Sequence, residues 1–300
     1  MAASSEDVVE RACGIRYWYR IGNGWAENDM RMKTLSLAIV LALHGTATMA
    51  AGSVGPSAGM ESNTWVELRG DIFGDREIEA AEGIVTLDVP YRAADDRRVP
   101  MSASASFDDG RTVTSLSLII DENPVPVSAE FAMETPVQAF DTTVAMRLNG
   151  PSRVRAVVEA SDGRLYMSEA FVKTSGLGAC AAPPITGVEE ALASLGEMDL
   201  KGTGALDRLK GNRATLDILH PQHSGMQMDQ ISLLYIPARY IETVEAWDDD
   251  GKLFTMTGSI SLSEDPSIAF DLPEGSDGVR VRITDTDEAV FEKRFALGGA

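Results

Sequence analysis

The chain has 300 residues, of which 46 are acidic and 26 are basic, so its formal net charge is −20. A surface this acidic argues against nucleic acid and anionic lipid as partners and favours a basic protein instead. The length is sufficient for two domains that each bury a hydrophobic core.

The first fifty residues differ in character from the rest of the chain. Residues 30–51 combine the basic Arg31 and Lys33 with an apolar stretch over 35–43 and small residues at 48–50. This order is typical of a secretory signal peptide. An uncut anchor is the alternative, but the apolar stretch is too short to span a bilayer. We therefore expect residues 1–29 to precede the true translation start. We expect the mature protein to be periplasmic, with no membrane insertion once the signal is cleaved.

Export has a consequence for the cysteines. Cys13 lies upstream of the expected cleavage site, so Cys180 is the only cysteine expected in the mature protein. A lone thiol in an oxidising compartment can pair with a second chain or serve a reactive role. Cys180 lies in TSGLGACAAPP (174–184), where small side chains and two prolines prevent a helix or a central strand. We therefore expect the thiol to be exposed.

The elements of the first half follow a period of two after one short helix. That helix is expected over 63–73, and near-alternating apolar residues predict strands over 99–106, 112–120, 153–160 and 164–172. Turn signals separate them at 109–110, 122–124, 149–151 and 162–163. Short strands at this spacing predict a β-sandwich over residues 60–175.

A linker over 176–204 follows, which carries Cys180 and a short helix. Val188, Leu192 and Leu195 would share one face of this helix, with Gly196 as its terminator. Residues 205–300 are predicted to form a second sandwich, with a hairpin turn at 249–251 and strands over 214–219, 232–236, 240–247, 253–260, 267–272 and 279–284. The predicted fold is mainly β: two immunoglobulin-like β-sandwich domains joined by a Cys-bearing linker and a short helix.

Two further groups of residues invite a metal-binding interpretation. His220, His223, Met226 and Met228 lie close together in sequence, and thioethers suit Cu(I). The alternative is a strand end followed by a turn. The acidic runs at 121–124 and 248–251 lack the ligand spacing of a calcium loop and are predicted to be turns. Four aromatic residues are predicted to lie in the core: Trp65, Trp247, Phe254 and Phe270.

Several short motifs follow one another along the chain in a specific order. In the first half they are DIFGDR (71–76), PYRA (90–93), IDENP (120–124), EASDG (159–163) and FVKTSG (171–176). In the second half they are HPQHSG (220–225), YIP (235–237) and SEDP (263–266). Over about residues 63–295 the chain resembles the carrier proteins Y and Z of bacterial sulfur oxidation. It is most similar to fused SoxYZ-like carriers associated with quinoprotein dehydrogenases.

The resemblance implies a role for Cys180. In the Y carriers, a cysteine on a flexible glycine-rich arm holds sulfur intermediates covalently and presents them to periplasmic enzymes. The match makes Cys180 the carrier residue, Gly176 and Gly178 its arm, and residues 205–300 the Z-like part. It favours a turn at 220–225 over a metal site. The arm of the Y carriers is a free C-terminus, whereas this one continues into a helix, and a tether fixed at both ends reaches less far.

The leading hypothesis is therefore a periplasmic carrier, not an enzyme, with a covalent adduct on Cys180 and no cofactor. The nearest cation in sequence is Lys173, so partner enzymes would supply the activation of the thiol. Those partners would be sulfur-metabolising or quinoprotein-dehydrogenase-system proteins, and a dimer through Cys180 stays open. The alternative is an accessory protein for a quinoprotein (PQQ) alcohol dehydrogenase, without covalent cargo. A periplasmic copper-binding protein is the third hypothesis.

Overall fold

The computed structural model describes residues 63–297, except residues 82, 177, 203–211 and 274. All of these residues lie in one compact unit, Ala58–Ala300. The predicted extension over 1–29 and the predicted signal peptide over 30–51 lie outside the described residues. No helix in the described part of the chain is long and apolar enough to cross a membrane.

Strands account for most of the described elements. The first half contains α1 (Asn63–Phe73), β1 (Ile78–Ala80), β2 (Val85–Asp88), β3 (Val99–Ser106), β4 (Val113–Ile120), β5 (Val127–Val137), β6 (Ala139–Met146), β7 (Ser152–Ala160) and β8 (Leu165–Val172). The second half contains α2 (Val188–Ala193), β9 (Met198–Gly202), β10 (Asn212–Ile218), β11 (Ile241–Trp247), β12 (Lys252–Gly258), β13 (Ser267–Leu272), β14 (Gly278–Asp285) and β15 (Val290–Ala296).

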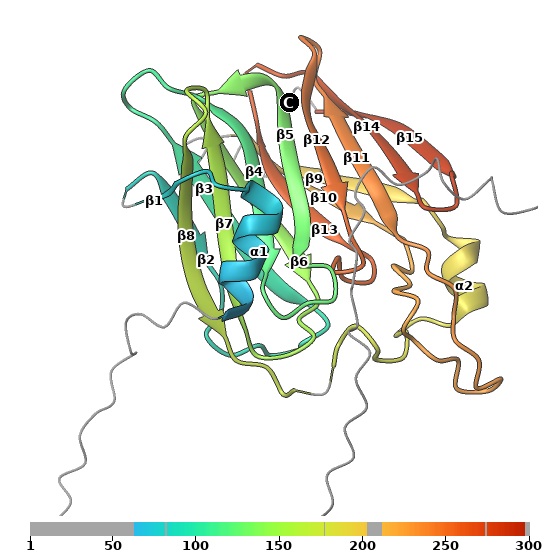
Figure 1. Cartoon of the computed structure of the whole chain (residues 1–300). Coiled ribbons are helices and arrows are strands. Elements are labelled where there is room, and N and C mark those ends of the chain that lie inside the picture. The colour runs from blue at the N-terminus through green and yellow to red at the C-terminus, as the bar shows by residue number, and fades with distance from the viewer. Residues whose placement is uncertain (1–62, 82, 177, 203–211, 274, 298–300) are drawn as a thin grey trace, which may run out of the picture. The chain divides into compact units, whose positions relative to one another are not determined.

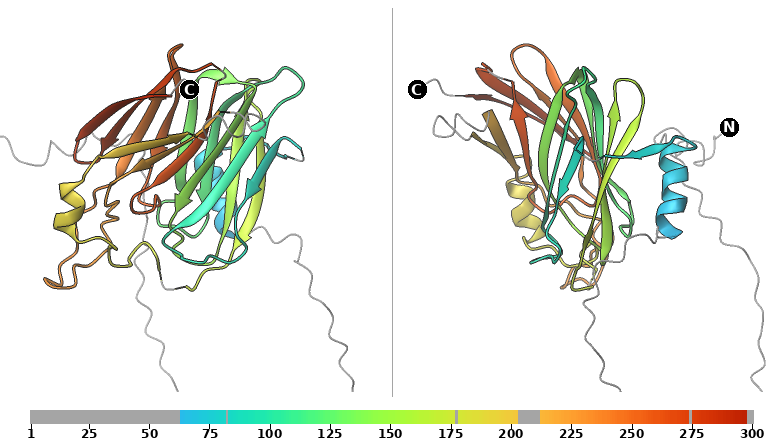
Figure 2. Two further views of the ribbon diagram at one scale, coloured as in Figure 1. Left: turned by 180° about the vertical axis from the view of Figure 1, so that it is seen from behind. Right: turned by 90° about the vertical axis from the view of Figure 1, so that its left-hand side faces the viewer.

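The strands form two sheets that run through both halves of the chain (Figures 1 and 2). The nine-stranded sheet has the order β1-β8-β7-β4-β5-β12-β11-β14-β15, and the six-stranded sheet has the order β2-β3-β6-β13-β10-β9. The halves join where β5 pairs antiparallel with β12 and where β6 pairs antiparallel with β13. The predicted mainly β, immunoglobulin-like architecture is confirmed. The structure adds that the two sandwiches share both of their sheets.

One cluster of buried apolar side chains fills the space between the sheets in both halves. Its centre is a set of aromatic rings at the junction. Phe131 and Phe254 lie with ring centroids 5.4 Å apart, and Phe254 and Phe270 lie 5.1 Å apart. Each fully buried side chain of this size stabilises the fold by about 1.5–3 kcal/mol. Phe254 and Phe270 are therefore core residues, as predicted.

Helix α1 packs on the outer face of the nine-stranded sheet (Figure 2). Trp65 is buried there against Ile119, Val157 and Leu165, so its prediction as a core residue is confirmed. The guanidinium of Arg155 lies 3.9 Å from the Trp65 ring centroid and forms an ion pair of 2.9 Å with the carboxylate of Asp121. Cation–π contact and charge pairing together allow this arginine to be buried.

Trp247 does not join the core, and the prediction for it is wrong. The inward positions of β11 are Ile241, Val244 and Ala246, so the next residue faces outward. Trp247 is half-buried on the outer face, with the guanidinium of Arg280 4.1 Å above its ring.

Two further expectations in the second half are wrong. Residues 232–236 do not form a strand; they belong to the long loop between β10 and β11, where Leu233 takes a left-handed conformation with φ +58°. In α2 the buried residue is Ala191, while Leu192 is exposed. Gly196 follows this helix with φ +78°, and a Cβ there would overlap the ring of Phe291, so glycine is required.

Candidate functional site

Cys180 lies on the segment between β8 and α2, which crosses one end of the sandwich (Figure 1). Its side chain is 0% exposed. The expectation of an exposed thiol is therefore wrong. The prediction of exposure was based on the small neighbouring side chains, which cannot cover the thiol. Small side chains also let the backbone approach the seam between the two halves closely, and there other residues cover the sulfur.

Buried polar side chains of the second half hold this segment through its backbone. The hydroxyl of Ser224 donates to the carbonyl of Cys180 at 2.6 Å, and the amide of Gln227 donates to the carbonyl of Ala182 at 3.0 Å. The carboxylate of Glu264 accepts hydrogen bonds from the N–H of Ile185 at 2.8 Å and from the N–H of Thr186 at 2.7 Å. Four hydrogen bonds from three side chains thus close the segment over the seam.

The first half holds the other end of the segment. Asp96 accepts a hydrogen bond of 2.8 Å from the N–H of Ser175, and its carboxylate also bonds the Ser175 hydroxyl. The two predicted arm residues shape the turn between: Gly176 has φ +79° and Gly178 has φ +74°. Residues other than glycine rarely adopt this backbone conformation, so glycine is needed at both positions.

A pocket of about 500 Å³ lies beside the segment. Its walls include Asp95, Asp96 and Arg97 from the loop before β3 and Gly178, Ala179 and Ala182 from the segment itself. Next to Cys180 the segment therefore presents only hydrogens and methyl groups to this pocket, and Ser175 lines it further along the chain.

Burial controls the chemistry of the thiol. It raises the pKa of Cys180 to about 11, and the positive charge of Arg147 opposes this rise. At neutral pH only about one thiol in ten thousand is ionised at such a pKa, so the covered thiol is inert. Arg147 is distant in sequence and was not predicted; it reaches the site because it directly follows β6.

Several residues next to the segment are polar and buried. They are Gln222, His223, Ser224, Gln227, Ser263 and Glu264. Nδ1 of His223 lies 3.3 Å from Oε1 of Gln227, whose amide nitrogen holds Ala182. Within the described residues, Nε2 of His223, Nε2 of Gln222 and Oγ of Ser263 are buried without a hydrogen-bond partner. Only the surrounding fold, and no local sequence signal, reveals these unpaired polar atoms.

The structure uses the weak metal candidates in another way. Nδ1 of His220 accepts a hydrogen bond of 3.2 Å from the N–H of Gln222, and Nε2 lies 3.5 Å from a carboxylate oxygen of Asp285. Both ring nitrogens are therefore engaged, while Met226 and Met228 lie half-buried in the loop that follows. No group of three His, Cys, Asp or Glu side chains that could hold a metal occurs among the residues the structure describes.

Burial also lowers the pKa of His220 to about 4, which makes stability depend on pH. The unfolded chain has a histidine pKa near 6.5, so it takes up the proton first as the pH falls. This contribution to stability is complete above pH 6.5 and is lost between about pH 6.5 and 4; it is on the order of 3 kcal/mol. Urea unfolding at pH 7.5, 5.5 and 4.5 should show this decline, and the variant His220→Gln should show a clearly smaller one. Equal slopes for both proteins would contradict it.

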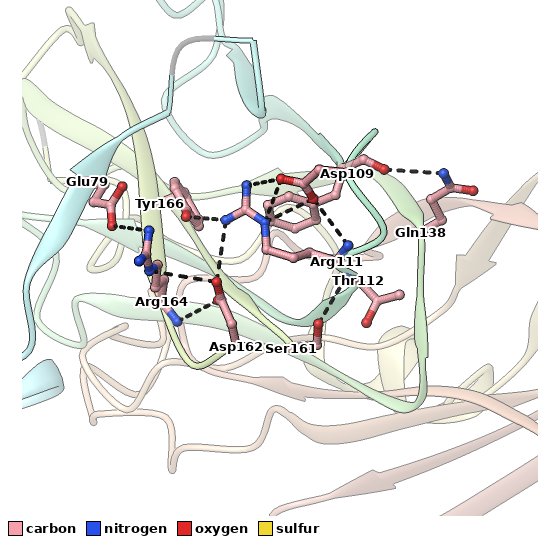
Figure 3. A network of polar contacts seen from close by, with 10 residues as sticks. Glu79, Asp109, Arg111, Thr112, Gln138, Ser161, Asp162, Arg164 and Tyr166 are labelled. Atoms are coloured by element: carbon pink, nitrogen blue, oxygen red, sulfur yellow. Dashed lines mark hydrogen bonds and ion pairs between the residues drawn. The ribbon is translucent and has the colours of Figure 1, made fainter.

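The most extensive network of charged side chains lies elsewhere (Figure 3). Arg111 pairs with Asp109 at 2.7 Å and stacks 4.7 Å from the ring of Phe107. It joins the β3–β4 loop to the β7–β8 turn through Asp162 and Tyr166. This network lies at the start of β8, whereas the Cys180 segment leaves from its end. It fastens two loops and contributes nothing to the cysteine site.

Comparison with known proteins divides the chain into two parts. The family model for sulfur oxidation protein SoxY matches residues 69–180, and the model for sulphur oxidation protein SoxZ matches residues 207–296. The sulfur carrier protein SoxY from Chlorobium limicola f thiosulfatophilum is 22% identical over 37% of this chain and 96% of its own, with a TM-score of 0.33.

Two variants of the superoxide reductase neelaredoxin from Ignicoccus hospitalis are also similar, each 15% identical. They cover 31% and 33% of this chain and 80% and 94% of their own, with TM-scores of 0.26 and 0.27. Among curated proteins none matches.

Proposed function

The chain belongs to the fused SoxYZ-like sulfur carriers, and from this premise we propose that it holds its cargo covalently on the thiol of Cys180. SoxYZ proteins are carriers rather than enzymes, and they work with sulfur-oxidation proteins. The proposal extends this to a periplasmic location, a sulfur adduct on Cys180, and presentation of that adduct to separate partner enzymes.

One observation carries the proposal: Cys180 lies on a segment that is attached by side-chain hydrogen bonds rather than by a β ladder. Opening residues 178–187 breaks no strand pairing, and the buried side chains among them are the small ones of Ala179 and Cys180. The SoxY match also ends at residue 180. Cys180 is the only cysteine in the described part of the chain.

The buried thiol then represents the closed state of the carrier. In the open state the thiol pKa would return to near 8.5, so a few per cent is ionised at neutral pH. Joining the thiol sulfur to the terminal sulfur of a thiosulfate-type anion forms one S–S bond and releases one proton. The two electrons pass to a partner redox protein. The cover limits this reaction to moments when a partner has opened the segment.

The burial of Cys180 also favours a second candidate. A thiol that is fully covered and mostly protonated fits a structural residue. The chain would then be an accessory protein for a quinoprotein dehydrogenase system, binding its partner without covalent cargo.

The intact mass of the protein tests the proposal. Protein is purified from the periplasmic fraction of cells grown on reduced sulfur compounds, and its mass is measured before and after reductant. We expect an added mass on the peptide that contains Cys180 which reductant removes. An unmodified thiol under every growth condition would favour the accessory role, and absence from the periplasmic fraction would refute the location.

A further inference from the structure

Arg147 is a buried cation whose charge is not matched. Its side chain is buried, and its guanidinium donates to the carbonyl of Gln222 at 2.6 Å and to that of Ile260 at 3.3 Å. Among the described residues no carboxylate lies within ion-pair distance of it. The carboxylate that acts on it from a longer distance, that of Glu264, uses both of its oxygens to hold Ile185 and Thr186. Burying a charge without an ion partner costs several kcal/mol.

Unpaired polar atoms occur in the two loops whose carbonyls bind Arg147, the β10–β11 loop and the β12–β13 loop. Of four buried side-chain atoms without a partner in the described residues, three belong to Gln222, His223 and Ser263. The exposed fractions of these residues are 0%, 4% and 1%. Buried polar groups are almost always paired in folded proteins, so unpaired groups on these two loops indicate a missing partner. Nδ1 of His223 faces the acceptor oxygen of Gln227, so Nε2 of the neutral ring is itself an acceptor. The unmet donors are therefore Nε2 of Gln222 and Oγ of Ser263.

These residues are connected to the cysteine segment. Gln222, whose carbonyl holds Arg147, is two residues before Ser224, whose hydroxyl holds the carbonyl of Cys180. Gln227 bonds both the ring of His223 and the carbonyl of Ala182. The group that a cation and unmet donors lack is an anion, and the neutral Cys180 thiol does not supply one.

We propose that Arg147, Gln222 and Ser263 form an anion-receiving cluster that holds the negatively charged end of the group carried on Cys180. The inference rests on the proposed function and deepens it. The cargo is a small sulfur group with a terminal negative charge, a persulfide or a sulfur oxoanion. The loaded chain keeps this group inside the seam, shielded from water and from reductants, until a partner opens the segment.

The segment can shift to make room for such a group. Around Cys180 it borders the pocket of about 500 Å³ through Gly178, Ala179 and Ala182. A displacement into this pocket moves hydrogens and methyl groups, so it meets little steric resistance.

The test uses tetrathionate as the loading probe. The full chain is unfolded in urea so that Cys180 is accessible, and its thiolate attacks a central sulfur of tetrathionate. One S–S bond forms, one breaks and thiosulfate leaves, so no further oxidant is required. The loaded chain is refolded by dilution, and release of the adduct by dithiothreitol is followed by mass.

Release from the refolded chain should be at least about tenfold slower than from the urea-unfolded chain, because the adduct is covered and its charge is paired. Arg147→Met should remove most of this protection, and Arg147→Lys should retain part of it. The matched control is Arg294→Met, which changes an exposed arginine of β15 that pairs with Asp249. This variant should not alter the protection of the adduct. Loading should also raise the urea midpoint of the wild-type chain and not that of Arg147→Met.

A purely structural role for Arg147 would lower the stability of loaded and unloaded chains equally, so it would leave the difference between them unchanged. That result overturns the proposal, as does equally fast release from folded and unfolded wild-type chains, or failure of the loaded chain to refold. Should Arg147→Met not fold, Ser263→Ala replaces it and must show a smaller loss of protection. Because loading is done in vitro, the outcome is independent of whether periplasmic protein carries an adduct.

Discussion

Replacing Cys180 by serine is expected to abolish covalent loading completely while leaving the fold intact. The substitution exchanges one atom, and the backbone carbonyl at this position still accepts the hydrogen bond from Ser224. A serine hydroxyl cannot form the S–S bond. Its burial costs about 1–3 kcal/mol if it finds no hydrogen-bond partner, which a sandwich of this size tolerates. The readouts are the reductant-labile mass on protein from the periplasm, growth on reduced sulfur compounds, and the melting temperature.

The matched control is Ala181→Ser, which places the same hydroxyl on the next residue, where the side chain is exposed. It should load and support growth like the wild-type chain. If Cys180→Ser supports sulfur-dependent growth as well as this control does, the covalent role is refuted and the accessory role takes its place.

Glu264→Ala is expected to uncover Cys180 by removing the carboxylate that accepts the N–H groups of Ile185 and Thr186. Hydrogen bonds to a charged group contribute about 1.5–3 kcal/mol each. Hydrogen bonds to water replace part of this lost free energy. We therefore expect the population of chains with the segment open to rise about tenfold to a hundredfold. Alkylation by iodoacetamide at pH 8 should accelerate by the same factor, because the open thiol regains an ordinary pKa while the covered one stays at about 11.

Global unfolding must be separated from local opening in this measurement. The free energy of unfolding is therefore determined for each variant, and the acceleration must exceed what global unfolding alone would give. Glu242→Ala is the control, since this exposed glutamate of β11 has no hydrogen bond or ion pair within the described part of the chain. An equal acceleration in both variants would show that Glu264 does not close the segment.

Strands with alternating apolar residues could be predicted from the sequence. Some strands were nevertheless missed. In β5 the buried Ala129, Phe131 and Met133 do alternate with exposed residues, but small and charged side chains between them weaken the signal. In the edge strand β15 the side chains are mostly exposed and several are charged. The loop at 232–236 was mistaken for a strand because it is rich in apolar residues, of which Leu233, Leu234 and Tyr235 are in fact exposed. Periodicity cannot distinguish an apolar strand from an apolar loop.

The position of Cys180 on a segment of small residues between the two halves could be predicted from sequence, but its surroundings could not. Its cover comes from Ser224, Gln227 and Glu264, and the charge beside it from Arg147. All four lie far from Cys180 in sequence and meet it only because β6 pairs with β13 across the junction. Local composition describes what a segment can do by itself, and it therefore predicted exposure for a residue that distant elements bury.

The antiparallel pairings of β5 with β12 and of β6 with β13 also fix how the two halves stay together. Two separate chains joined along such strands would associate by mass action and would come apart on dilution. In a single polypeptide the partner strands are always present at a high effective concentration. Assembly is therefore insensitive to expression level, and the stoichiometry is permanently one to one.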